Sequence, residues 1–190
     1  IVESIITRLR LELDPRYTYH SVEHTLDVIE AAERIGHAEG LTNDELQLVK
    51  LAASYHDSGF LINDSIHEEH GCEIFRKDAG TMCSTAESDL ICGMIMATKI
   101  PQKPQNKLER ILGDADLDYL GRADFYPIAD SLFEEFKFRG VVNDELGWME
   151  LQVGFFESHH YWTDYSKHER AAQKAARLKE LKERLVDLED

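Results

Sequence analysis

The sequence predicts an all-α protein, and three observations support this prediction. Apolar residues recur at helical spacing along most of the chain, whereas the alternation typical of β-strands is rare. Two capping boxes, at 42–45 and 84–87, mark helix starts. The four Pro and eleven Gly lie mostly between the periodic stretches. We therefore expect helices over residues 2–13, 21–35, 42–56, 66–78, 84–98, 104–112, 123–138, 144–158 and 167–188.

The first three helices have clear starts or stops. The first carries an apolar stripe through Leu9 and ends before Pro15. The second has Val22 and Leu26 on one face and is followed by Gly36. The third opens with its capping box and continues in an apolar run up to a polar His-Asp pair.

The later helices follow from the same signals. The fourth is short, the fifth opens on the second capping box, and the sixth is followed by the polar segment 113–116. The seventh and eighth precede a last helix with leucines at heptad-like spacing: Leu178, Leu181, Leu185 and Leu188. Because this stripe lasts under two heptads, we expect it to pack on its own domain and leave a homodimer as the alternative.

Composition restricts the class of protein. The chain has 190 residues, 43% of them hydrophobic, which suits one globular domain over 1–190. A net charge of −16 argues against binding duplex nucleic acid or an anionic membrane surface, because both partners attract cations. A small phosphorylated substrate remains compatible if the site holds a cation. Nine His beside 37 Asp and Glu suit metal binding.

The cysteines and the apolar runs indicate the compartment. Cys72, Cys83 and Cys92 are odd in number and lack a CxxC spacing, which favours reduced thiols over disulfides or a thiolate zinc site. No apolar run approaches the roughly 18 to 20 residues that span a bilayer, and no signal peptide is visible. We expect a cytoplasmic protein without a membrane partner. The start at Ile1 leaves open that the chain is part of a longer one.

Side chains of metal-ligating type recur at four places. They are His20 and His24, the dyad His56-Asp57, His67 and His70 beside Glu68-Glu69, and the pair Asp114 and Asp116. Each alone has a simpler explanation, such as a hydrogen-bonded core imidazole or a helix cap. Together, imidazoles and carboxylates on separate helices can converge on one ion. Mixed nitrogen and oxygen ligands suit Mn, Fe, Co, Ni or Zn better than Ca.

The ordered set H…HD…D resembles the signature of the HD superfamily of metal-dependent phosphohydrolases. Four segments carry the resemblance: YHSVEHTLDV at 19–28, ASYHDSG at 53–59, HEEHG at 67–71 and DADLDYLG at 114–121. The resemblance implies an HD-domain helical bundle with a metal site between core helices. The motif-bearing core would span about 19–121, followed by C-terminal helices over about 123–190.

The resemblance also implies the ligands. They would be His24, His56, Asp57 and Asp116; members of the family usually show a small residue before the last ligand and Leu after it, as Asp116 does. Asp114 would then cap a helix or support the ligands.

By the same resemblance the chain is a hydrolase of a small phosphoester, such as a nucleotide. His67 or Glu68 would orient or deprotonate the attacking water, and His20 would protonate the leaving oxygen. Lys99 would offer positive charge to a second phosphate. The substrate and the choice of metal stay open.

Two departures from the family pattern keep alternatives open. Binuclear members carry a His in the stretch that here reads 94–99 and has none, so we expect one ion and leave a second, through His67, open. Phe60 and Leu61 stand where mononuclear nucleotidase members have a Glu. The alternatives are a non-catalytic HD module that binds metal or nucleotide and regulates a partner domain, and an HD-type di-iron oxygenase.

Overall fold

The computed structural model describes residues 1–189, and over this range the chain is all-α. It contains nine α-helices and two short 3₁₀-helices within that range. The elements are α1 (Val2–Glu12), α2 (Val22–Ala38), α3 (Asn43–Tyr55), η1 (Ser58–Leu61), α4 (His67–Ala79), α5 (Thr85–Ala97), α6 (Lys107–Asp116), η2 (Asp118–Gly121), α7 (Phe125–Phe138), α8 (Glu145–Ser158) and α9 (Asp164–Glu189). The prediction of an all-α fold is confirmed.

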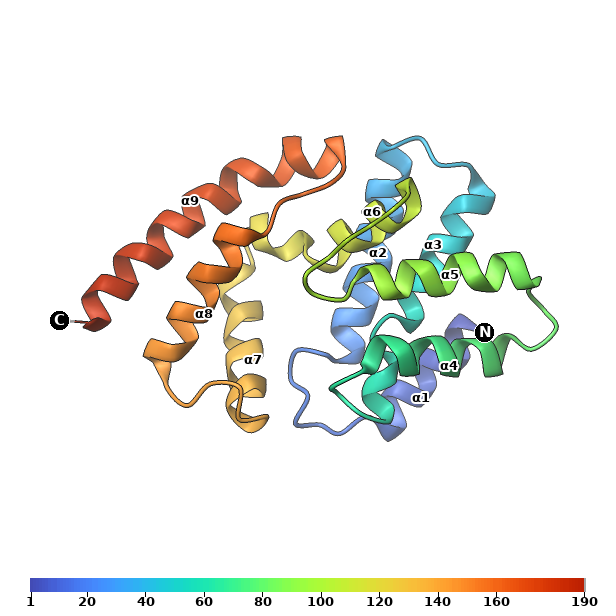
Figure 1. Cartoon of the computed structure of the whole chain (residues 1–190), viewed down its shortest axis with the longest axis horizontal. Helices are drawn as coiled ribbons and strands as arrows, with labels where there is room; N and C mark the ends of the chain where they lie inside the picture. Colours follow the sequence, from blue (N-terminus) through green and yellow to red (C-terminus); the bar gives the residue numbers. More distant parts are fainter. Residues whose placement is uncertain (190) are drawn as a thin grey trace.

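The helices form two groups that lie side by side (Figure 1). In the first, α2 packs against α3 and α6, and α5 packs against α3, α4 and α6. In the second, α9 packs against α8 and η2. Each group has its own apolar core. The chain passes from one group to the other at the end of α6, so residues there face both groups.

Side-chain caps explain where several helices begin. Thr42 and Ser84 both form the reciprocal capping box that the sequence predicts. The Ser21 hydroxyl accepts a hydrogen bond from the His24 backbone amide, so α2 begins at Val22. His20 therefore lies before this helix rather than on a shared face with His24.

Predicted boundaries of three helices are wrong by three or more residues: those of α2 and α6, and the start of α9, which begins at Asp164. Helix α2 continues through Gly36 to Ala38. Gly36 does not end the helix but packs closely against α3, where a Cβ would lie 2.7 Å from a Leu46 methyl carbon. Helix α6 begins after Asn106, whose side chain caps it, and runs through the polar segment to Asp116.

The last helix packs on its own chain. Leu181 is 1% exposed, and Leu178 and Leu185 pack against the core of the second group, whereas Leu188 is 39% exposed. Among residues 1–189, no helix combines the length and the apolar character needed to cross a membrane.

Candidate metal centre

Four side chains converge where the two groups of helices meet. His24 comes from the first turn of α2, His56 and Asp57 directly follow α3, and Asp116 ends α6. The Nε2 atoms of His24 and His56 lie 3.3 Å apart. Asp57 Oδ2 lies 3.4 Å from the His24 Nε2 atom and 3.0 Å from that of His56. Asp116 Oδ1 lies 3.2 Å from the His24 Nε2 atom and 3.5 Å from that of His56.

The separations fit an ion. Donors bound at about 2.1 Å in tetrahedral or octahedral geometry lie roughly 3.0 to 3.4 Å from their neighbours. The tightest group is His24, His56 and Asp57, all of them buried, and these three could hold a metal ion. Asp57 Oδ2 is buried without a hydrogen-bond partner, which is costly unless a cation faces it. Asp116 approaches the same two imidazoles from α6.

His56 is oriented by its backbone. The ring is fully buried, and its Nδ1–H donates to the Ala53 carbonyl oxygen at 2.7 Å. This bond leaves the Nε2 lone pair directed at the cluster, as is common for metal-ligating His.

Charge balances within the cluster. Burial opposes protonation of His24, yet its hydrogen bond with Asp116 and the nearby Asp57 carboxylate outweigh burial and raise its pKa to about 8. Burial opposes protonation of His56 likewise, but the Asp57 charge raises its pKa well above the usual range. Burial would raise the pKa of Asp116, but its hydrogen bonds with both His lower it to about 2. A divalent cation can replace the imidazole protons in this arrangement.

Asp114 points elsewhere. Its carboxylate is fully buried and accepts hydrogen bonds from the Trp162 and Thr163 backbone amides and from the Thr163 hydroxyl. It therefore fixes the loop between α8 and α9. The structure brings Asp116, not Asp114, to the imidazoles.

His67 and Glu68 adjoin the cluster at the start of α4. His67 Nδ1 donates to the Asp64 carbonyl oxygen at 3.0 Å, which directs Nε2 toward the cluster. That Nε2 lies 3.6 Å from Asp57 Oδ1 and 3.3 Å from Glu68 Oε1. Glu68 is buried. These groups extend the donor set beyond the four side chains at the centre.

His20 is held by a residue that the sequence analysis did not identify. Glu135, on α7 and 0% exposed, hydrogen-bonds the His20 ring at Nδ1 and accepts the backbone amides of Tyr19 and His20 at 3.0 Å. Phe60 stacks on the same ring, with centroids 4.2 Å apart. The available signal was weak: Glu135 lies three residues after Leu132, on the apolar stripe of α7.

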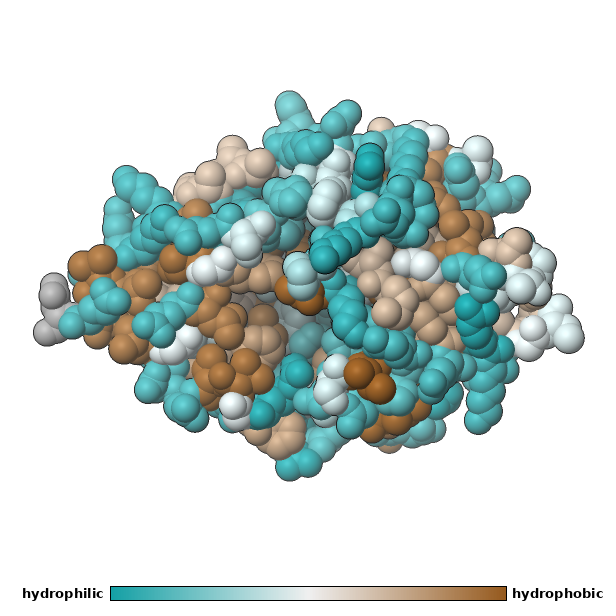
Figure 2. Space-filling model, in the orientation of Figure 1, coloured by the Kyte–Doolittle hydropathy of each residue, from teal (hydrophilic) through white to brown (hydrophobic). Residues whose placement is uncertain are grey.

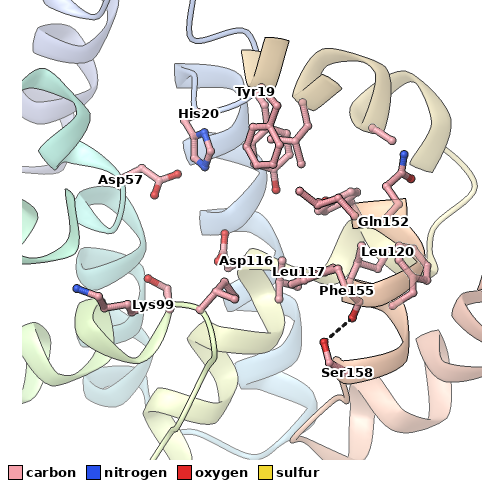
Figure 3. A pocket seen from close by; sticks show the side chains of 18 of the residues that line it. Tyr19, His20, Asp57, Lys99, Asp116, Leu117, Leu120, Gln152, Phe155 and Ser158 are labelled. Atoms are coloured by element: carbon pink, nitrogen blue, oxygen red, sulfur yellow. Dashed lines mark hydrogen bonds between the residues drawn. The ribbon is translucent and has the colours of Figure 1, made fainter. Parts of the chain in front are cut away.

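Lys99 is less available to bind a substrate phosphate than the sequence predicts. Its ammonium group pairs with Glu69 and lies 3.8 Å from Glu68. Its side chain nevertheless lines the same cavity as the centre (Figure 3). This cavity has a volume of about 610 Å³ and extends from the centre between η2, α7 and α8.

The comparisons with known proteins do not place the chain in a family. No family model matches it, and neither a curated protein nor a solved structure matches it at a significant level. The likeness to HD phosphohydrolases therefore rests on the motif residues.

Proposed function

We propose that the chain is a metal-dependent phosphohydrolase of the HD type that acts on a small phosphoester. One observation supports this most: two imidazoles and two carboxylates from α2, the segment after α3 and the end of α6 lie together, each carboxylate within 3.5 Å of both imidazoles, and both carboxylates line a cavity. Among the described side chains, His24, His56, Asp57 and Asp116 would hold the ion. A bound divalent ion supplies Lewis acidity toward a phosphoryl oxygen and toward water.

Polar groups beside the four candidate ligands would serve as the general base and the general acid. His67 directs Nε2 toward the cluster beside buried Glu68, and one of these two groups would accept a proton from the attacking water. On the other side, Glu135 fixes Nδ1 of His20, so the protonated ring presents Nε2–H. His20 can therefore donate a proton to the leaving oxygen.

His24→Gln tests the proposal. The purified protein would be loaded with Mn, Co or Zn and assayed on p-nitrophenyl phosphate and a panel of nucleotides. We expect His24→Gln to lose bound metal and at least about 100-fold in turnover. His37→Gln is the matched control, since His37 lies exposed on the same helix. Both should fold.

Metal content distinguishes the competing functions. One ion per chain with turnover supports the proposal. Bound metal without turnover of any phosphoester would favour the non-catalytic module. Two tightly held irons would favour the oxygenase, with His67 and Glu68 completing a second site.

A further inference from the structure

The cavity beside the metal centre changes character along its length. Polar groups line one end, where His20, Asp57 and Asp116 lie, and apolar side chains line the other (Figure 3). The apolar end includes Leu117 and Leu120. Figure 2 shows a hollow between the two groups of helices with apolar residues around its α7–α8 side. A substrate with its phosphate at the centre would extend its body into the apolar end.

Aromatic and aliphatic residues of α7 and α8 form the walls of that end. Phe136 and Trp148 contact edge to face with centroids 5.8 Å apart, and both line the cavity. Leu132 and Phe155 line it as well. Such walls bind hydrocarbon or ring surface, and about 610 Å³ lies within the usual range of small-molecule pockets.

Positive charge is scarce in the cavity. Among the described lining residues Lys99 is the one Lys or Arg, and Glu69 and Glu68 already face it. A nucleoside di- or triphosphate needs cations for each further phosphate. The cavity therefore suits one phosphate, held at the centre.

One polar group interrupts the apolar end. Gln152, on α8, is 7% exposed and lines the cavity, and its Oε1 is buried without a hydrogen-bond partner. Figure 3 shows it across the cavity from His20 and Asp57. A buried amide oxygen without a donor is costly, and a turn of the side chain toward the cavity would let this oxygen accept a hydroxyl or N–H donor of the ligand.

We infer that the substrate is a phosphate monoester of an elongated apolar alcohol that carries a hydrogen-bond donor remote from the phosphate. This inference rests on the proposed hydrolase function and narrows its substrate class. Gln152 would be the residue that selects the donor, and the walls around Trp148 would select the apolar body.

A chain-length series tests the apolar part. With metal-loaded protein, kcat/KM would be measured on n-butyl, n-octyl and 8-hydroxyoctyl phosphate and on a nucleoside monophosphate. Each buried methylene raises kcat/KM by up to about fourfold, so kcat/KM for octyl phosphate should exceed that for butyl phosphate at least about tenfold. Gly154→Leu should reduce this ratio, because Gly154 lines the cavity and a Cβ there meets nothing within 4 Å. Glu150→Leu adds the same side chain at an exposed position of α8 and should keep the ratio.

Gln152→Leu tests the polar part. In the unaltered protein 8-hydroxyoctyl phosphate should be at least as good a substrate as octyl phosphate. In Gln152→Leu the ratio of the two should fall about tenfold, because the hydroxyl then enters the cavity without an acceptor.

The outcomes separate the two proposals. Hydrolysis that ignores chain length, or that prefers the nucleotide at least tenfold, overturns the inference and leaves the hydrolase function standing. If no ester is hydrolysed but calorimetry shows binding that tightens with chain length in the unaltered protein and not in Gly154→Leu, the apolar cavity assignment stands and the hydrolase function fails.

Discussion

Glu135 sets the orientation of His20 from outside the motif segments. Its carboxylate accepts two backbone amides and bonds the ring at Nδ1. Glu135→Gln keeps the shape but removes the charge that favours Nδ1–H, so we expect kcat to fall about 10- to 100-fold with metal content unchanged. Glu134→Gln is the control, because Glu134 is exposed and pairs only with Lys137 among the described residues. Loss of metal in Glu135→Gln would show that Glu135 supports the whole site rather than the acid.

His159 gives the fold a specific sensitivity to acid. Burial, with the nearby Lys174 charge, lowers its pKa from 6.5 to about 3. Between these pKa values the unfolded chain binds a proton that the folded chain does not, so the free energy of unfolding falls as the pH falls through this window. This loss is absent above a pH of about 6.5.

Urea unfolding at pH 7 and pH 5 measures this effect. Between pH 7 and pH 5, we expect the free energy of unfolding of His159→Phe to fall by roughly 2 kcal/mol less than that of the unaltered protein. His168→Gln should behave like the unaltered protein, since the His168 side chain is 86% exposed. Equal pH dependence in all three proteins would contradict the assignment.

The sequence predicts single residues well where their neighbours in the chain supply the reason. The dyad His56-Asp57 stands out because two polar residues follow an apolar helical run. Glu135 does not stand out, because its partner His20 lies 115 residues away. Gln152 likewise becomes notable only when the cavity beside it is known.

At the scale of elements, Gly59 holds η1 against α4. A Cβ at Gly59 would lie 1.9 Å from the His67 carbonyl oxygen, so Gly59→Ala must separate the two elements. We expect a loss of about 1–3 kcal/mol of stability and a loss of turnover, because His67 and Glu68 begin α4. Gly154→Ala, where a Cβ meets nothing within 4 Å, should instead stabilise α8 by up to about 1 kcal/mol. Urea unfolding compares the two, and a fully stable Gly59→Ala would refute the close approach.

The starts of α3 and α5 are predicted well, whereas the end of α6 is not. The capping boxes at Thr42 and Ser84 depend on residues three apart, which a sequence displays directly. The end of α6 depends on distant groups instead. Its last turn carries Asp114 and Asp116, whose partners lie on the α8–α9 loop and on α2 and α3. In the sequence alone these partners are not visible, and two acidic residues after an apolar turn then indicate that the helix has ended.

At the scale of the whole molecule, Asp118 ties the two groups of helices together. Its buried carboxylate pairs with Arg34 of α2 at 2.6 Å and with Arg170 of α9 at 2.8 Å. Arg122 lies 3.6 Å away. The sequence shows a net charge of −16 but not which cations are used internally. The structure shows that Arg34, Arg170 and Arg122 surround the Asp118 carboxylate where the two groups of helices meet.

Metal binding at the candidate centre should stabilise the whole fold. The four candidate ligands converge only in the folded chain, so an ion at about 100 times its dissociation constant would add about 2.7 kcal/mol. For a domain of this size that corresponds to a rise in Tm of about 5–10 °C. His24→Gln should abolish the rise and His37→Gln should keep it, as differential scanning calorimetry with and without a chelator would show. An equal rise in His24→Gln would mean that the ion binds the acidic surface of the −16 chain instead of the centre.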